Sequence, residues 1–321
     1  MKKAYLGIDV GSVSTNLIVI DEQYEVLASL YLRTQGQPIR VIQEGMENLS
    51  HLVPDDIEIE AAGTTGSARY LAGVMVGADI IKNEITAHAV ATSRFVPGVQ
   101  TILEVGGQDS KIIILRDGIV TDFAMNTVCA AGTGSFLDQQ SARLCIPIED
   151  FGGLALKAKN PVRIAGRCTV FAESDMIHKQ QLGHSTEDII AGLCEALVRN
   201  YLNNVGKGKE ILPPIAFQGG VAANAGIKKA FEDALGQEVI IPKNFAVMGA
   251  FGVAILAREA VERNQENTKF KGFEVTDFNY KTRSFECKSC SNHCEVVQFF
   301  QNGEVIARWG SRCGKWDVEA S

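Results

Sequence analysis

Two similar series of apolar strand-like runs and helical patterns follow one another along the chain. In the first series, β-branched runs separated by a Gly/Ser/Thr-rich turn predict a hairpin, and apolar residues three and four apart predict amphipathic helices. The expected strands are residues 4–10, 17–20, 25–33, 57–62 and 79–81, and the expected helices are 38–51, 67–75 and 84–95.

The second series begins after residues 96–99. Its expected strands are residues 101–105, 111–116, 215–218 and 238–241, and its expected helices are 133–144, 169–181, 186–205, 222–235 and 246–263. Repetition of β-rich blocks with interleaved helices predicts a two-lobed α/β protein. We expect a first lobe at 1–96 completed by the helix at 246–263, a second lobe at 97–245, and a small Cys-rich extension at 264–321, where the composition changes.

Composition excludes several classes of protein. The 321 residues are 46% apolar and 21% charged, as in ordinary globular proteins. The net charge of -7 and the lack of a basic run argue against nucleic-acid binding. The N-terminus enters a strand pattern without a signal core, and no apolar run reaches the length of a bilayer. We therefore expect a cytoplasmic protein without a membrane partner.

Three glycine-rich turns each follow an apolar strand. They read GIDVGSVST at residues 7–15, EVGGQDSK at 104–111 and QGGVAAN at 218–224. Glycine lets backbone N–H groups close on phosphate oxygens, and a helix N-terminus adds a favourable dipole. Asp9 supplies a hard oxygen for Mg²⁺ or its waters, and Asp109 does the same or orients an attacking water. One such turn is weak evidence, but three in this order favour a nucleotide site.

The predicted nucleotide site differs from two common alternatives. The chain has no GxxxxGK[ST] sequence, which excludes a P-loop, and the first turn lies in a hairpin rather than a βαβ unit. We expect catalytic carboxylates at Asp9, Glu104 and Asp109. The expected nucleotide-binding residues are Gly11, Ser12, Ser14, Thr15, Gly106, Gly107, Gln108, Lys111, Gly132, Gln218, Gly219, Gly220, Ala222 and Asn224.

These turns resemble the phosphate-1, phosphate-2 and adenosine motifs of the superfamily of acetate and sugar kinases, heat-shock chaperones and actin. Residues 4–15, 102–112 and 215–224 carry the resemblance. It implies two duplicated ribonuclease-H-like lobes with ATP and Mg²⁺ in the cleft between them.

Two of the eight cysteines precede predicted helices, Cys129 in NTVCAAGTGS and Cys168 in AGRCTVFAES. A helix N-terminus favours a thiolate, so both positions suit ligands of an anionic cluster. A [4Fe–4S] cluster needs about four thiolates. A two-fold dimer in which each chain gives two would supply them. From the residues alone, plain buried thiols are an open alternative.

VCAAGTGSFLDQQ and AGRCTVFAESDMI resemble the two signature segments of the 2-hydroxyacyl-CoA dehydratase activators, a family that includes the benzoyl-CoA reductase ATPase subunits and the reductases of double-cubane cluster proteins. The resemblance covers residues 4–260. It implies an ATPase that works under anaerobic conditions as a homodimer, with one [4Fe–4S] cluster held by Cys129 and Cys168 of both chains. The family usually has Asp at the start of the second phosphate motif, where this chain has Glu104.

The implied activity is an ATP-driven, one-electron reductive activase. A ferredoxin- or flavodoxin-like donor would reduce the cluster, and the acceptor would be an iron–sulfur enzyme, either a 2-hydroxyacyl-CoA dehydratase or a double-cubane cluster protein. Two alternatives stay open: a small-molecule kinase of the same superfamily, and a chaperone-like or sensory ATPase in which the cysteines hold structural zinc.

The remaining cysteines divide into two groups. We expect Cys145 and Cys194 to be core residues. The C-terminal set of Cys287, Cys290, Cys294 and Cys313 has spacing compatible with zinc or with a second Fe–S site. Free or disulfide-forming thiols are a third alternative for this set.

Overall fold

The computed structural model describes residues 1–265 and 267–317, and it divides into two compact units. The first unit comprises Met1–Ala87 and the chain from Gly249 onward, and the second comprises His88–Met248. The division falls inside helix α3 (Glu84–Phe95), earlier than the expected boundary near residue 96. In the described part of the chain, no helix combines the length and apolar character needed to cross a bilayer.

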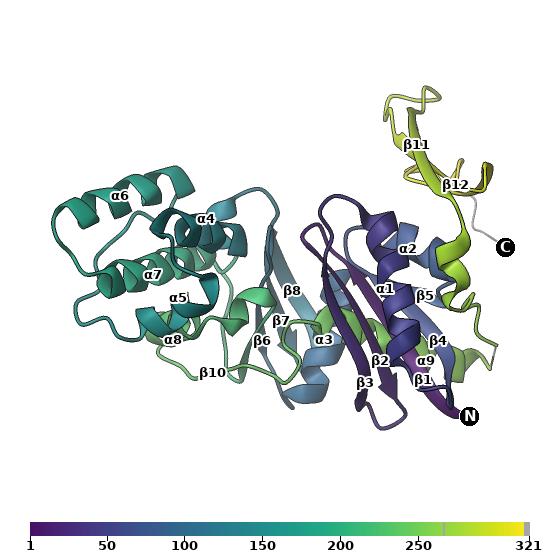
Figure 1. Cartoon of the computed structure of the whole chain (residues 1–321), viewed down its shortest axis with the longest axis horizontal. Coiled ribbons are helices and arrows are strands. Elements are labelled where there is room, and N and C mark those ends of the chain that lie inside the picture. The colour runs from purple at the N-terminus through teal and green to yellow at the C-terminus, as the bar shows by residue number, and fades with distance from the viewer. Residues whose placement is uncertain (266, 318–321) are drawn as a thin grey trace. The chain divides into compact units, whose positions relative to one another are not determined.

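A mixed five-stranded sheet forms the centre of the first unit (Figure 1). Its order is β3-β2-β1-β4-β5, in which β1, β2 and β3 form an antiparallel meander and β4 and β5 run parallel to β1. The strands are β1 (Lys2–Val10), β2 (Ser14–Asp21), β3 (Val26–Arg33), β4 (Ile57–Thr65) and β5 (Ile80–Ile81).

The second unit repeats this topology. Its sheet has the order β10-β9-β6-β7-β8, with an antiparallel meander of β6, β7 and β8 and with β9 and β10 parallel to the first strand of the meander. The strands are β6 (Thr101–Val105), β7 (Ser110–Arg116), β8 (Ile119–Asn126), β9 (Ile215–Gln218) and β10 (Val239–Ile240). Identical order and direction in both units confirm the predicted duplicated actin-like α/β fold.

Helices cover these sheets through their apolar faces. In α1, for example, Val41, Ile42, Met46 and Leu49 are buried at helical spacing, and a proline opens the first turn. The helices of the first unit are α1 (Pro38–Leu52), α2 (Arg69–Val76) and α9 (Met248–Asn264). Those of the second unit are α4 (Gly134–Leu144), α5 (Ile148–Ala155), α6 (Thr169–Gln181), α7 (Thr186–Asn204) and α8 (Ala225–Leu235). The sequence pattern had not indicated β8 or α5.

Glycine allows α9 to lie directly on the first sheet. A Cβ at Gly7 of β1 would lie 1.9 Å from the carbonyl oxygen of Ala250, and one at Gly63 of β4 would lie 2.5 Å from that of Val253. No side chain fits such a gap, so both strands need glycine where the helix crosses them. Gly7 of the first predicted nucleotide motif is therefore a packing residue.

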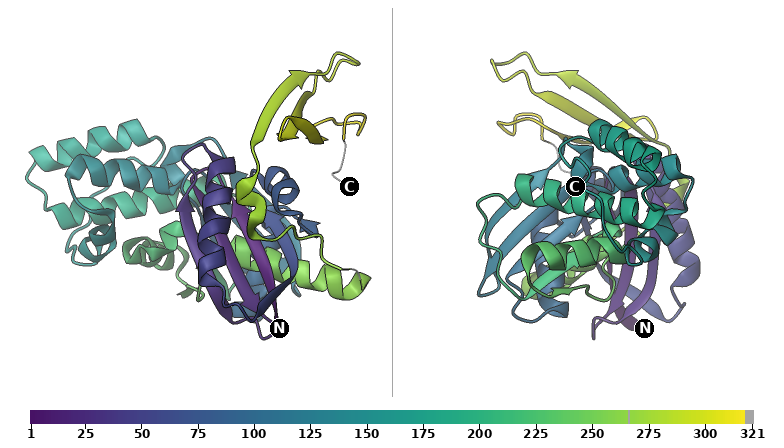
Figure 2. Two further views of the ribbon diagram at one scale, coloured as in Figure 1. Left: turned by 45° about the vertical axis from the view of Figure 1, so that its right-hand side comes forward. Right: turned by 90° about the vertical axis from the view of Figure 1, so that its left-hand side faces the viewer.

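The C-terminal extension is an antiparallel sheet of β11 (Tyr280–Glu286), β12 (Glu295–Gln301) and β13 (Glu304–Trp309), which Figure 2 shows from two sides. It shares the apolar core of the first unit through fully buried Val275 and Phe299. The side-chain amide of Gln43 on α1 lies 3.0–3.3 Å from three carbonyl oxygens of residues 275–278. The extension is thus attached to α1 by both apolar and polar contacts.

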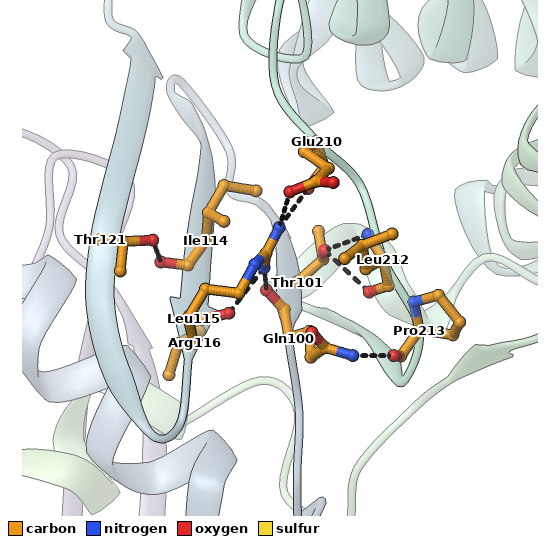
Figure 3. A network of polar contacts seen from close by, with 9 residues as sticks. All are labelled: Gln100, Thr101, Ile114, Leu115, Arg116, Thr121, Glu210, Leu212 and Pro213. Atoms are coloured by element: carbon orange, nitrogen blue, oxygen red, sulfur yellow. Dashed lines mark hydrogen bonds and ion pairs between the residues drawn. The ribbon is translucent and has the colours of Figure 1, made fainter.

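A polar network fastens the start of β6 and the end of β7 to the chain that leads into β9 (Figure 3). The Thr101 hydroxyl donates to the carbonyl of Leu212 (3.0 Å) and accepts from its N–H (3.1 Å). Arg116 donates to the carboxylate and carbonyl of Glu210 (2.9 and 3.0 Å). Thr101 is fully buried, whereas the Glu210 side chain is 73% exposed, so the threonine dominates the network energetically.

We predict that Thr101→Val lowers the free energy of unfolding by about 1–3 kcal/mol, because it leaves two backbone groups of Leu212 without their partner at nearly constant volume. Urea denaturation measures the change. Glu210→Gln is the matched control and should cost less than about 1 kcal/mol, because its ion pair is solvent-exposed. Equal losses in the two variants would contradict this ranking.

Candidate functional site

The first glycine-rich turn joins β1 to β2. Gly11 N–H donates to the carbonyl of Ser14 (2.9 Å), and the Thr34 hydroxyl donates to the Gly11 carbonyl (2.9 Å). Thr15 is fully buried, and its hydroxyl pairs with that of Thr34 (2.9 Å). Ser12 is exposed at the tip of the turn. Ser12 and the backbone of the turn are therefore available to a ligand, while the Thr15 side chain serves the hairpin.

Asp9 lies near the end of β1, beside the turn that follows β4. Gly66 in that turn has a φ of +92°, and a Cβ there would lie 2.6 Å from Asp9 Oδ1. The backbone thus closes over the carboxylate with no room for a side chain. Asp9 is half-buried, as expected for a carboxylate that serves a hydrated cation rather than the core.

The second turn contains a buried group of charges. Lys111 Nζ donates to Glu104 Oε2 (3.0 Å) and to Asp109 Oδ2 (2.7 Å), and the side chains of Lys111 and Glu104 are only 3% and 6% exposed. The turn itself is closed by a bond from Gly106 N–H to the Asp109 carbonyl (3.0 Å). Lys111, expected as a nucleotide ligand, therefore holds the two carboxylates together in this structure.

The third turn lies against the second. Gly219 has a φ of +88°, and a Cβ there would lie 2.5 Å from the Val105 carbonyl oxygen and 2.8 Å from Glu104 Oε1. A Cβ at Gly106 would lie 3.4 Å from the same oxygen, so Glu104 is close to both glycine turns. The fold brings these two predicted motifs together, as the parallel pairing of β6 with β9 requires.

Several predicted ligands in the third turn have structural partners. Gln218 is fully buried and is bonded to α3 at both ends of its amide: Oε1 accepts from Thr92 Oγ1 (2.7 Å), and Nε2 lies 2.8 Å from His88 Nδ1. Asn224 caps α8 by accepting from Ile227 N–H (3.1 Å). Any contact of Gln218 with a nucleotide would therefore come from its backbone. The remaining predicted residues are the exposed Gln108 and Gly220, the half-buried Gly107 and the buried Gly132 and Ala222.

Cys129 and Cys168 stand on two loops of the second unit, and both are half-exposed and free of disulfides. Cys168 is the N-cap residue of α6, as expected. Cys129 precedes a short 3-10 turn at Ala130–Gly132, after which α4 begins. The Asn126 amide fixes the backbone of Cys129 by accepting from its N–H (2.9 Å) and donating to its carbonyl (2.7 Å).

Exposed apolar side chains surround these two cysteines. Val128 is 94% exposed, and Val170 and Phe171 are 65% and 63% exposed. Each stands within three residues of a cysteine, so apolar side chains flank both thiols at the surface. Among residues 1–265 and 267–317, no group of three or more His, Cys, Asp or Glu is arranged as metal ligands.

The other cysteines give a mixed result. Cys194 is buried on α7, where burial raises its pKa to about 12, which confirms the expectation of a core thiol. The same expectation was wrong for Cys145, which is exposed because it ends α4 in the left-handed conformation (φ 54°). Cys145 is therefore the C-cap of α4 and not a core residue.

The C-terminal cysteines lie on the β11–β12 loop and after β13. Cys287 N–H donates to the carbonyl of Cys294 (2.8 Å), and the Trp316 indole donates to Cys287 Sγ (3.2 Å). The Ser289 backbone and Trp316 lower the pKa of Cys287 to about 7. Cys290 and Cys313 are exposed, and the described residues do not gather the four thiols as ligands. The second metal site stays a prediction.

Comparison with known proteins identifies the family. The model of the BadF/BadG/BcrA/BcrD ATPase family matches residues 6–257. The chain belongs to this ATPase family. It is 36% identical over 260 residues to the (R)-2-hydroxyglutaryl-CoA dehydratase activating ATPase of Acidaminococcus fermentans, covering 78% of this chain and 96% of the relative. The C-terminal extension lies beyond the family match.

Solved structures place this ATPase family member in the same fold. The activator of the 2-hydroxyisocaproyl-CoA dehydratase from Clostridium difficile, with bound ADPNP, is 29% identical and superposes with a TM-score of 0.71 over 82% of this chain and 97% of that chain. A ROK family glucokinase from Streptomyces griseus shares the fold alone, at 12% identity, over 80% of this chain and 99% of that one, with a TM-score of 0.50.

We predict that Lys111→Met lowers the stability of this ATPase by about 3–5 kcal/mol, because it strands the buried Glu104 carboxylate without a cation. Adding Glu104→Gln to the same chain should restore part of that loss, as a double-mutant cycle of urea midpoints would show. Lys229→Met breaks an exposed ion pair with Asp233 and is the control, with an expected cost below about 1 kcal/mol. Additive losses in the double variant would contradict a direct Lys111–Glu104 interaction.

Proposed function

We propose that this protein is an ATP-dependent reductive activase that passes one low-potential electron to a partner iron–sulfur enzyme. The observation that carries the proposal is the exposure of two disulfide-free thiols, Cys129 and Cys168, beside exposed apolar side chains on the unit that contains two of the three glycine-rich turns. A kinase needs no such thiols. Membership of the family supports ATPase activity. The two thiols favour an electron-transfer protein over a phosphotransferase.

We assign the phosphates of ATP to the glycine-rich turns and Mg²⁺ to their carboxylates. Gly106 and Gly107 are half-buried and Gly220 is exposed, so their backbone can approach phosphate oxygens. Asp9 and Asp109 are the carboxylates we assign to Mg²⁺ and to the attacking water, with Glu104 in support. Lys111 keeps Asp109 oriented through its 2.7 Å bond. ADPNP in the related activator structure supports this assignment.

The two cysteine loops fit an anionic iron–sulfur cluster shared by two chains. Cys168 opens α6, where helix N–H groups and the dipole favour a thiolate. The Asn126 side chain bonds both the N–H and the carbonyl of Cys129, which supports the backbone of this loop. A [4Fe–4S] cluster needs about four thiolates, and two copies that each give Cys129 and Cys168 would supply them. A cluster bound there would supply a single low-potential electron.

Exposed apolar residues at the cysteine loops support the same homodimer. Val128, Val170 and Phe171 would leave water when two copies meet around their cysteines, which favours association by the hydrophobic effect. Burial of these side chains would also exclude water from the cluster and so affect its potential. The chain's own residues thus provide both the thiols and the apolar rim of the proposed site.

Relatives support the choice of acceptor. Their names describe activators of 2-hydroxyglutaryl-CoA, 2-hydroxyisocaproyl-CoA and lactoyl-CoA dehydratases. For this chain we propose an acceptor of the same kind, either a 2-hydroxyacyl-CoA dehydratase or a double-cubane cluster protein. A ferredoxin- or flavodoxin-like protein would be the electron donor.

The test is the electronic spectrum and iron content of protein purified without oxygen. We predict a brown protein whose iron and charge-transfer absorption are lost in Cys129→Ser and in Cys168→Ser, because each variant removes two thiolates from a shared site. Cys145→Ser is the matched control and should keep both, since Cys145 is an exposed cysteine elsewhere on the same unit. Iron-free wild-type protein, or serine variants with an unchanged spectrum, would overturn the proposal.

A further inference from the structure

One face of α7 supports the chain that leads to Cys168. A Cβ at Gly192 would lie 2.0 Å from the Val162 carbonyl oxygen, and a Cβ at Gly166 would lie 2.5 Å from that of Ala196. These contacts recur one helical turn apart, so the segment at residues 162–166 runs along the helix in van der Waals contact. Arg199 adds a bond to the carbonyl of Ile164 (2.6 Å).

Asn200 lies at the end of this contact. It reaches both cysteine segments, which are residues 126–135 around Cys129 and residues 163–171 around Cys168. Its Nδ2 donates to the carbonyl of Gly166, two residues before Cys168, at 2.6 Å. A Cβ at Gly132, three residues after Cys129, would lie 2.7 Å from its Oδ1. Asn204 Nδ2 donates to the same Oδ1 (2.8 Å), which fixes the orientation of the amide. Asn200 is 6% exposed, so water does not compete for these bonds.

The next residue on α7 reaches the nucleotide motif. The Tyr201 hydroxyl donates to the carbonyl of Lys111 (2.6 Å), and Lys111 in turn holds Glu104 and Asp109. Tyr201 is fully buried, and burial raises its pKa well above the ordinary value, so the hydroxyl keeps its proton at neutral pH. Asn200 and Tyr201, which are adjacent on α7, therefore contact both cysteine segments and the strand β7 that follows the second turn.

A second connection joins the second glycine-rich turn (residues 104–111, the proposed phosphate turn) directly to the segment that follows Cys129. Gly134 N–H donates to the Gly106 carbonyl (2.8 Å), and Ser135 donates through its N–H and its hydroxyl to the Gly107 carbonyl (2.8 and 2.7 Å). These are the first residues of α4, whose N–H groups lack partners inside the helix. Because these bonds do not involve α7, they provide a separate route from the turn to Cys129.

We propose that Asn200 and Tyr201 are positioning residues that transmit movement of the phosphate turn to the Cys168 segment, while the bonds between the turn and α4 transmit it to Cys129. The inference rests on the proposed function, since it assigns these residues to the coupling of nucleotide and cluster. A nucleotide that binds the turn differently as ATP and as ADP then shifts both cysteine segments together.

Two measurements test this coupling on the full-length protein. The first is hydrogen exchange of the segments at 126–135 and 163–171 with ADP and with a non-hydrolysable ATP analogue. The second is the midpoint potential of the iron–sulfur centre in the same two nucleotide states. In wild-type protein both segments should differ in exchange between the two nucleotides, and the potential should shift.

Asn200→Asp is the informative variant because it keeps the size and shape of the side chain, yet a carboxylate has no proton to donate to the Gly166 carbonyl. We expect it to lose the nucleotide-dependent exchange difference at 163–171, to reduce the shift in potential, and to keep the exchange difference at 126–135. Tyr201→Phe, which removes only the hydroxyl, should do the same. Asn203→Ala, exposed on the same helix, is the control and should retain all three signals.

An exchange difference at 163–171 that persists in both folded variants would overturn the coupling, and so would its absence from wild-type protein. Thermal melts identify a variant that fails to fold, in which case the other variant decides. If wild-type protein lacks iron, the proposed function fails on its own, and the exchange measurement still decides whether Asn200 and Tyr201 link the turn to the Cys168 segment.

Discussion

The structure of the second unit depends on the bonds between the phosphate turn and the first residues of α4. The N–H groups at the start of a helix need partners from outside the helix, and here the carbonyls of Gly106 and Gly107 provide them. Movement of the turn that we assign to phosphate would therefore strain or break its bonds to the start of α4. Since Cys129 lies just before that helix, a few backbone bonds would join the proposed nucleotide site to the proposed cluster site.

The charge arrangement beside this turn explains how buried carboxylates are tolerated there. Lys111 lies between Glu104 and Asp109, so one cation offsets two anions, and its contact with Glu104 is almost closed to water. A bound Mg²⁺ would add positive charge on the open side of Asp109, which is 31% exposed. Glu104 accepts a hydrogen bond from Lys111 (3.0 Å), so it has a structural role that is visible in the fold.

Sequence reasoning identified most of the strands and helices because their apolar periodicity is strong. It missed β8, whose side chains are mostly exposed, and α5, which is short and contains two glycines. The motif residues were brought together as expected for the second and third turns. Side-chain directions were not predictable: Gln218 faces α3 and Thr15 faces Thr34, because the partners that bind them come from distant parts of the sequence. Asn200 carries no local motif, so its contacts emerge only in three dimensions.

Native mass spectrometry of protein kept free of oxygen tests the central claim most directly, because it counts chains and clusters in one particle. We predict a dimer with a single four-iron cluster, since each chain would give Cys129 and Cys168 to the proposed site. We also predict that removing the cluster leaves a dimer that separates more readily. A monomer that carries its own cluster, or a dimer in which each chain binds one, would contradict a shared site.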